Sequence, residues 1–166
     1  MTEAHRSVTE IMKRGLFAGI AGGVAEVAWV SLYAAISGAN AAVVARGVTT
    51  AAGVTALLPA APATAGIAVH MMLAALLGVV LSGLWQSLAG REYGTNALYG
   101  FMVAALAFVW AMNFFVVLPA VDPSFVHLLP YSVSLVSKLL FGVAAAETLR
   151  RTAFQGKAAP ARSRRT

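Results

Sequence analysis

The sequence predicts an all-α, polytopic membrane protein: a four-transmembrane-helix bundle with an outer re-entrant or interfacial segment between its first and second helices. Three observations predict this fold class. Hydrophobic residues make up 60% of the 166 residues and charged residues only 11%, which leaves too few charges to cover a small soluble globule. Four apolar stretches are long enough to cross a bilayer. Most basic residues lie outside those stretches.

The four stretches contain very few charged residues. A bilayer core of about 30 Å is crossed by roughly 20 apolar helical residues. Backbone groups in lipid must find their hydrogen bonds within the segment, so each stretch is predicted to be a helix. The first contains Glu26, the second has no formal charge, the third contains Asn113, and the fourth contains Lys138 and Glu147. The predicted spans are residues 15–37, 66–89, 95–118 and 128–149.

The basic residues predict the orientation of these helices. With four spans, ten of the twelve Lys and Arg residues fall on one side, Arg46 falls on the other, and Lys138 is embedded. Basic loops stay in the cytoplasm, so we expect a multi-pass protein of the bacterial inner membrane with both termini cytoplasmic. The ten residues are Arg6, Lys13, Arg14, Arg91, Arg150, Arg151, Lys157, Arg162, Arg164 and Arg165.

The chain divides into a cytoplasmic N-terminal segment (residues 1–14), a four-helix transmembrane domain (15–149) and a basic, disordered cytoplasmic tail (150–166). The tail is expected to bind anionic lipid head groups, at about 1 kcal/mol per basic residue near the surface. An acidic partner protein is the alternative, and nucleic acid is not the expected partner. The basic residues of the tail are Arg150, Arg151, Lys157, Arg162, Arg164 and Arg165.

The connection at residues 40–58 has two interpretations. It is rich in Ala and Val, but it also contains Arg46, two glycines and three threonines, and a fifth span would place the basic tail outside. We therefore expect a short helix on or dipping into the outer surface. A cleaved signal peptide is the competing interpretation of the first apolar run, but that run exceeds the usual 7–15 residues and contains a carboxylate.

Small residues recur at spacings of three and four along the predicted helices. Such stripes let membrane helices approach closely, so we interpret them as packing seams. In the first helix the stripe comprises Gly15, Ala18, Gly19, Gly22 and Gly23; in the second, Gly66, His70, Ala74, Gly78, Ser82 and Gln86; in the fourth, Ser134, Lys138, Gly142 and Ala145.

Two charges of opposite sign lie near the centres of the first and last spans. A charge at the centre of a spanning helix costs about 2.5–3.5 kcal/mol on insertion scales. Glu26 and Lys138 reach similar depth when counted from opposite sides of the membrane, and each continues a small-residue stripe. We therefore predict a buried Glu26–Lys138 pair. The pair either fixes helix register, takes part in proton or ion translocation, or binds a ligand head group.

A second set of polar residues is predicted near the outer face. It comprises His70, Met71, Asn113, Asp122 and His127. Imidazole, thioether and carboxylate groups together can bind a transition metal such as copper, and a haem between the two histidines is a further alternative. The set has no tight metal-ligand spacing, so packed or hydrogen-bonded side chains are the favoured interpretation, and no metal or cofactor is expected.

Signatures of soluble enzymes are absent from the sequence. There is no G-x-x-x-x-G-K-[ST] phosphate loop, no G-x-S-x-G nucleophile turn and no H-E-x-x-H zinc motif. The chain has no cysteine, which excludes disulfides, thiolate metal sites and a cysteine nucleophile. We therefore expect a protein that is not an enzyme.

Three features of the chain resemble small four-helix bacterial inner-membrane proteins of unknown function. They are the Gly-Leu-Phe-Ala-Gly run at 15–19, His70 at the start of the second helix, and Leu-Tyr-Gly at 98–100. The resemblance covers all four helices and implies neither an activity nor site residues.

Two functions follow from these expectations. The first is a small non-enzymatic accessory or structural subunit of a membrane complex, or a homo-oligomer, because four short helices enclose little interior of their own. The second is a proton- or ion-coupled transporter or channel component that uses the Glu26–Lys138 pair.

Overall fold

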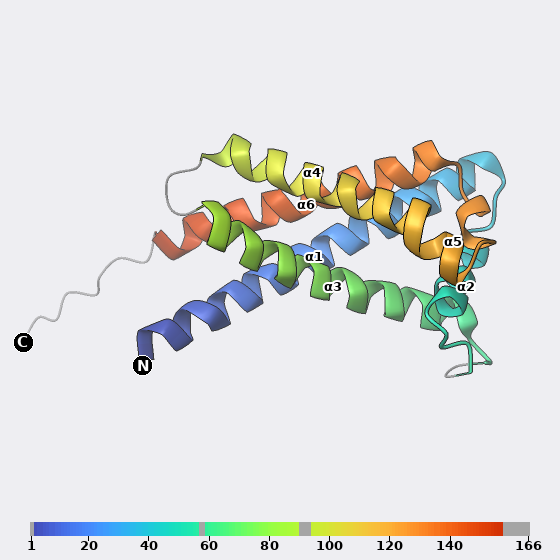
Figure 1. Cartoon of the computed structure of the whole chain (residues 1–166), viewed down its shortest axis with the longest axis horizontal. Helices are drawn as coiled ribbons and strands as arrows, with labels where there is room; N and C mark the ends of the chain where they lie inside the picture. The colour runs from blue at the N-terminus through green and yellow to red at the C-terminus, as the bar shows by residue number, and fades with distance from the viewer. Residues whose placement is uncertain (1, 57–58, 90–93, 158–166) are drawn as a thin grey trace, which may run out of the picture.

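The computed structural model describes residues 2–56, 59–89 and 94–157, and every regular element within these ranges is a helix. Four long helical segments run along the molecule, and a short helix, α2, lies at one end (Figure 1). We call this end the α2 end, and the end where α1 begins and α6 finishes the terminal end. The long segments are α1 (Thr2–Ser37), α3 (Pro62–Ala89), α4 (Thr95–Met112) and α6 (Tyr131–Lys157). The segment of α4 continues without a break to Val121.

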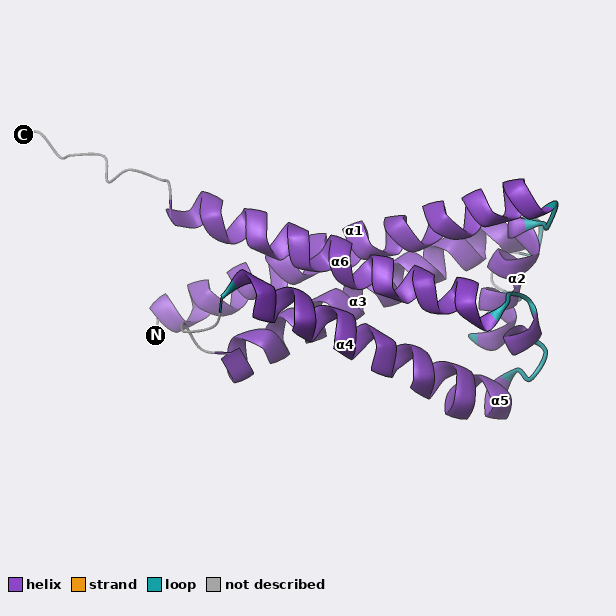
Figure 2. Ribbon diagram, turned by 90° about the horizontal axis from the view of Figure 1, so that it is seen from above, coloured by secondary structure: helices purple, strands orange, loops and turns teal. Residues whose placement is uncertain are grey.

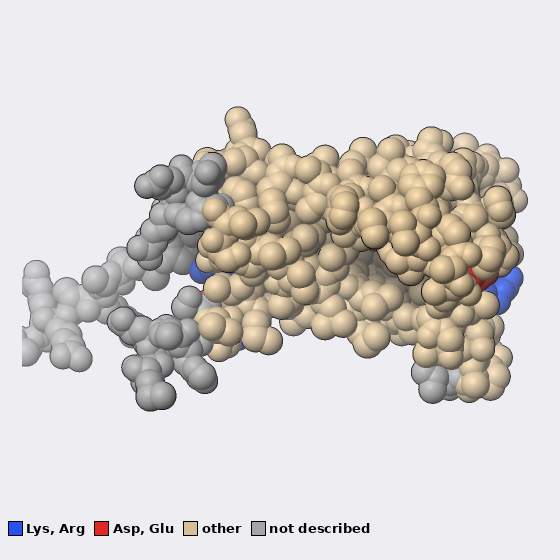
Figure 3. All heavy atoms as spheres, viewed as in Figure 1, with Lys and Arg blue, Asp and Glu red and all other residues tan. Residues whose placement is uncertain are grey.

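Four helices are long and apolar enough to cross a membrane. Their candidate spans are Val8–Ser37, Pro62–Leu88, Thr95–Val121 and Tyr131–Thr152. They coincide with the four predicted stretches, which confirms the all-α fold with four such helices. On the face seen in Figure 3, the Lys, Arg, Asp and Glu atoms of the described residues lie only near the two ends of the molecule.

The connection between α1 and α3 contains the short helix α2 (Ala41–Ala51). Gly38 ends α1 with a positive φ of 73°, which glycine adopts without a steric penalty. The Asn40 side chain then accepts a hydrogen bond of 2.9 Å from the Ala42 N–H as the N-cap of α2. At 1.5 Å per residue, α2 is about 16 Å long, so it is too short to be the fifth span considered for residues 40–58.

The third long segment changes its helical pitch near the α2 end. After α4, residues Asn113–Val117 form one π-helical turn (η1), and α5 (Leu118–Val121) completes the segment. A short 3₁₀ helix, η2 (Phe125–His127), then leads to α6. Asp122 accepts hydrogen bonds from the Ser124 N–H and hydroxyl, at 3.2 and 2.5 Å, as expected for an Asp-Pro pair that begins a turn.

Helix α1 holds the bundle together because it packs against both α3 and α6, while α4 packs against α6; Figure 2 shows this arrangement from above. The α1–α3 contact is a backbone-to-backbone approach: a Cβ at Gly19 would lie 2.3 Å from the Ala74 carbonyl oxygen, and one at Gly78 would lie 2.4 Å from the Gly19 Cα. Against α6, Gly22 leaves room for the ring of Phe141. The predicted small-residue seams of α1 and α3 therefore pack against each other.

Helices α1 and α6 both extend beyond the predicted spans that end the transmembrane domain at residues 15 and 149. α1 begins at Thr2, so the segment 2–14 is a continuous part of the first helix. α6 continues to Lys157, so residues 150–157 are helical where a disordered tail was expected. The loop residue Arg91 and the tail residues Arg162, Arg164 and Arg165 lie outside the described residues.

Replacing Gly19 with alanine is expected to destabilise the bundle. The new Cβ would meet backbone atoms of Ala74 that cannot move aside locally, and overpacking of this kind costs about 1–3 kcal/mol. We expect the Tm of Gly19→Ala in detergent, followed by circular dichroism, to fall by several degrees.

Gly83→Ala is the matched control, since a Cβ at Gly83 has no heavy atom within 4 Å. Its Tm should stay constant or rise, because alanine favours a helix over glycine by about 1 kcal/mol. Equal Tm values for the two variants would contradict the close α1–α3 approach.

Candidate functional site

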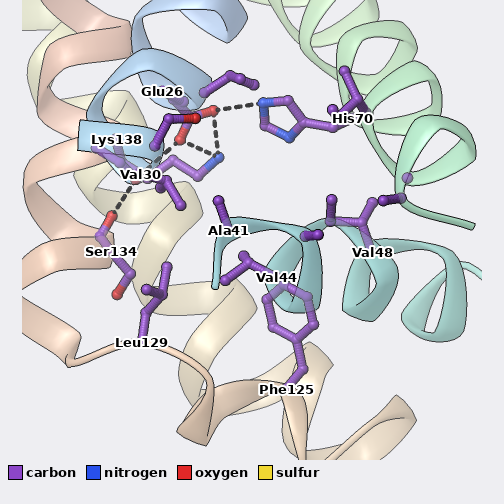
Figure 4. Close-up of a pocket in the computed structure, with 18 of the residues that line it drawn as sticks. Glu26, Val30, Ala41, Val44, Val48, His70, Phe125, Leu129, Ser134 and Lys138 are labelled. Carbon is purple, nitrogen blue, oxygen red and sulfur yellow. Dashed lines mark hydrogen bonds and ion pairs between the residues drawn. The ribbon is translucent and has the colours of Figure 1, made fainter. Parts of the chain in front are cut away.

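Glu26 of α1 and Lys138 of α6 form an ion pair between the two helices. Lys138 Nζ lies 2.8 Å from Oε1 and 2.9 Å from Oε2 of Glu26 (Figure 4). Glu26 is only 4% exposed, and 18% of the Lys138 side chain is exposed. The sequence predicted this contact from the cost of two isolated charges, and the structure brings the two residues together.

A third helix brings His70 to the same place. His70 Nε2 of α3 lies 3.6 Å from Glu26 Oε2 (Figure 4), which is too long for a hydrogen bond. Among the described residues, His70 Nε2 is the one buried side-chain nitrogen or oxygen without a hydrogen-bond partner. We call Glu26, Lys138 and His70 the polar centre.

Two serines of α6 support the carboxylate side of the polar centre. The Ser137 hydroxyl lies 3.3 Å from Glu26 Oε1 and 2.7 Å from the Ser134 carbonyl oxygen. Ser134 Oγ in turn accepts a hydrogen bond of 3.0 Å from Trp110 Nε1 of α4. Both serines are buried, so α6 carries polar groups along the face that meets α1 and α4.

A cavity of about 290 Å³ adjoins the polar centre on the side of the α2 end. Glu26, His70, Lys138 and the two serines give it a polar end, while its walls are apolar (Figure 4). A mostly apolar cavity with a few converging polar groups is the usual form of a small-molecule site. The apolar wall residues include Val27, Val30, Val44, Ala45, Val48, Ile67, Phe114, Phe125 and Leu129.

Helix α2 closes the cavity because two glycines let it approach its neighbours. A Cβ at Gly66 of α3 would lie 1.7 Å from the Ala45 carbonyl oxygen, so α2 rests directly on the α3 backbone. A Cβ at Gly47 would lie 2.6 Å from Leu128 Cδ1 and 2.9 Å from the ring of Phe125. The helix that the sequence predicted as an outer surface element is thus one wall of the candidate site.

The outer polar set proposed from the sequence does not form a cluster. Of its five members, only His70 belongs to the polar centre. Asp122 caps its own turn, His127 is exposed, and Met71 packs beside Gly23 of α1. Within the described ranges, no group of three or more His, Cys, Asp or Glu residues could hold a metal ion.

A second polar network lies near the terminal end, and the sequence analysis missed it. Glu147 of α6 accepts hydrogen bonds from the Tyr99 hydroxyl of α4 and from the guanidinium groups of Arg150 and Arg151. The two arginines lie three and four residues after Glu147, a spacing that places them on the same helix face. That spacing could have predicted the ion pairs of Glu147 with the two arginines from the sequence. The contact with Tyr99 could not be predicted in this way, because it depends on how α4 packs against α6.

No family model, curated protein or solved structure matches this chain. The resemblance to small four-helix bacterial membrane proteins therefore stays an expectation. The three features behind it have local explanations: Gly15 and Gly19 pack against α3, His70 belongs to the polar centre, and Tyr99 donates to Glu147.

Glu147→Gln is expected to weaken the attachment of α4 to α6. The amide loses the negative charge that holds two guanidinium groups and the Tyr99 hydroxyl. The Tm of the purified variant should fall, and Tyr99→Phe, which removes only the α4 contact, should give part of that decrease.

Glu10→Gln supplies the matched control, since Glu10 is exposed and its nearest basic atom, Arg14 Nε, is 3.9 Å away. Surface changes of this type usually stay within about 0.5 kcal/mol. If Glu147→Gln melts at the same temperature as Glu10→Gln, the network does not join the two helices.

Proposed function

We propose that this protein is a small component of a membrane transport system and that the Glu26–Lys138 pair is its proton- or ion-coupled element. One observation carries the proposal: the buried ion pair borders a cavity, with Glu26 and Lys138 both in its lining. Ionisable residues within spanning segments commonly mark ion pathways and proton relays.

The cavity favours this function over that of a purely structural subunit. A pair that only fixed the register of α1 and α6 would be expected to have packed side chains on every side. Here the two charged groups border a cavity of about 290 Å³. They also lie beside His70 Nε2, which makes no hydrogen bond. The space beside the pair can admit a molecule that alters its interactions.

The two sides of the polar centre differ in a way that suits alternating access. The cavity lies toward the α2 end, whereas the opposite side is filled by Phe141, Met102 and Leu106, each at most 1% exposed. The ring of Phe141 lies directly beside the centre, with its centroid 5.9 Å from Lys138 Nζ. A transporter needs a second arrangement in which this barrier opens, so we propose that the chain acts as an oligomer or with a partner subunit.

The same proposal includes placement in a bacterial inner membrane with both termini cytoplasmic. It is supported by the four apolar helices and by the bias of basic residues toward the terminal end. α2 would then lie at the outer surface. The same proposal keeps the basic C-terminal residues as the part of the chain that contacts anionic lipid head groups; Arg150 and Arg151 also contact Glu147.

Proton flux into liposomes tests this function. Purified protein is reconstituted with a pH-sensitive dye inside, and a potassium gradient with valinomycin drives protons inward. We expect flux above that of protein-free liposomes for the unchanged chain and for Glu10→Gln, and a return to the protein-free rate for Glu26→Gln. Flux that is unaffected by Glu26→Gln, or absent from the unchanged chain, would contradict a proton-coupled role.

A further inference from the structure

The polar centre contains one nitrogen without a hydrogen-bond partner, and the residue that carries it lines the cavity. His70 Nε2 is buried, makes no hydrogen bond, and belongs to a residue that lines the cavity. A buried polar atom without a partner costs about 1–3 kcal/mol. A ligand atom that bonded this nitrogen would remove the cost, so His70 Nε2 is the atom toward which a ligand's polar group would be directed.

The charges of the centre indicate the charge of that ligand. Glu26 and Lys138 pair at 2.8 Å and contribute opposite formal charges, and no other Asp, Glu, Lys or Arg lines the cavity. With a neutral imidazole, the formal charge of the site is zero. An ionic head group would leave one uncompensated charge beside mostly apolar walls, which is unfavourable. The site therefore selects an uncharged head group.

A hydroxyl group fits this position better than other uncharged groups. An imidazole nitrogen can be a donor or an acceptor, depending on the tautomer. A hydroxyl serves either tautomer because it both donates and accepts. The other ring nitrogen of His70 is hydrogen bonded to the backbone of Gly23, so Nε2 of the neutral imidazole is an acceptor and a ligand hydroxyl donates to it. A carbonyl group, which only accepts hydrogen bonds, could not satisfy this nitrogen.

The remainder of the cavity indicates an apolar body. Its walls are aliphatic side chains with two phenyl rings, Phe114 and Phe125. The face of the molecule in Figure 3 is hollowed between α4 and α3. Two wall residues of the cavity come from these segments: Ile67 from α3, and Phe114 from η1, the turn that follows α4. An opening on the side of the bundle would admit molecules dissolved in the bilayer.

We propose that the cavity binds an uncharged, lipid-soluble alcohol or phenol, with its hydroxyl donating to His70 Nε2 and its hydrocarbon body against α2 and Phe125. This inference names the substrate class of the proposed transport component and rests on that function for its physiological meaning. Binding itself is measured independently of proton flux.

Photolabelling in lipid nanodiscs tests the proposal. The probes are three molecules with one diazirine-bearing ten-carbon chain and different heads: an alcohol, a carboxylic acid and an amine. Labelled residues are identified by mass spectrometry, with unlabelled 1-decanol as competitor. We expect the alcohol alone to label cavity residues such as Val48 and Phe125 in a saturable way.

Two pairs of variants locate the binding. His70→Phe removes the unpartnered nitrogen and should weaken apparent affinity about tenfold, the effect of one lost hydrogen bond, whereas His127→Phe changes an exposed histidine and should have no effect. Val48→Trp fills the cavity and should abolish labelling, whereas Val80→Trp adds the same side chain at an exposed position of α3 and should not. Circular dichroism and Tm confirm that each variant is folded.

Saturable labelling by the acid or the amine that equals that of the alcohol would overturn the proposal, as would an unchanged affinity in folded His70→Phe. These results are separable from the transport test. Glu26-dependent proton flux without alcohol labelling would overturn the ligand class and leave the transport function standing. Alcohol labelling without flux would support the binding site and contradict the coupled transport.

Discussion

The structure depends on one interaction, the ion pair that joins Glu26 of α1 to Lys138 of α6. Either charge alone would be costly at a buried position, so each requires the other helix to be in place. The close packing around the pair supports this arrangement, because Gly22 accepts the ring of Phe141 next to Lys138. Helix α1 also meets α3 through Gly19 and Gly78. Positioning the pair therefore positions three of the four long helices.

The pair also determines the chemistry available to the cavity. Its two charges balance, so the polar end of the cavity is strongly dipolar without a formal excess charge. His70 adds a nitrogen with no hydrogen-bond partner, and α2 adds an apolar wall. Phe141 separates this end from the terminal half of the bundle. The proposed transport function and the proposed ligand both follow from that asymmetry.

The sequence predicted the four helices and the Glu26–Lys138 contact because both follow from strong constraints: apolar length and the cost of isolated charge. It did not predict that His70 would join the pair, since its place near a helix start suggested an interfacial residue. The role of α2 depends on Gly66 allowing contact with Ala45. Gly66 belongs to a predicted packing seam, but nothing in the sequence indicates that α2 is the helix that packs there. Trp29 and Trp110 both donate hydrogen bonds to α6, and these contacts likewise depend on how α1 and α4 pack against it.

The most direct test is a double-mutant cycle on the free energy of unfolding, with Glu26→Gln, Lys138→Met and the combined variant. Each single change leaves one buried charge without its partner and should cost about 3 kcal/mol. The combined variant removes both charges, so its loss should be clearly smaller than the sum of the single losses. Single losses that add within about 0.5 kcal/mol would show that the two side chains do not interact, which would contradict the account.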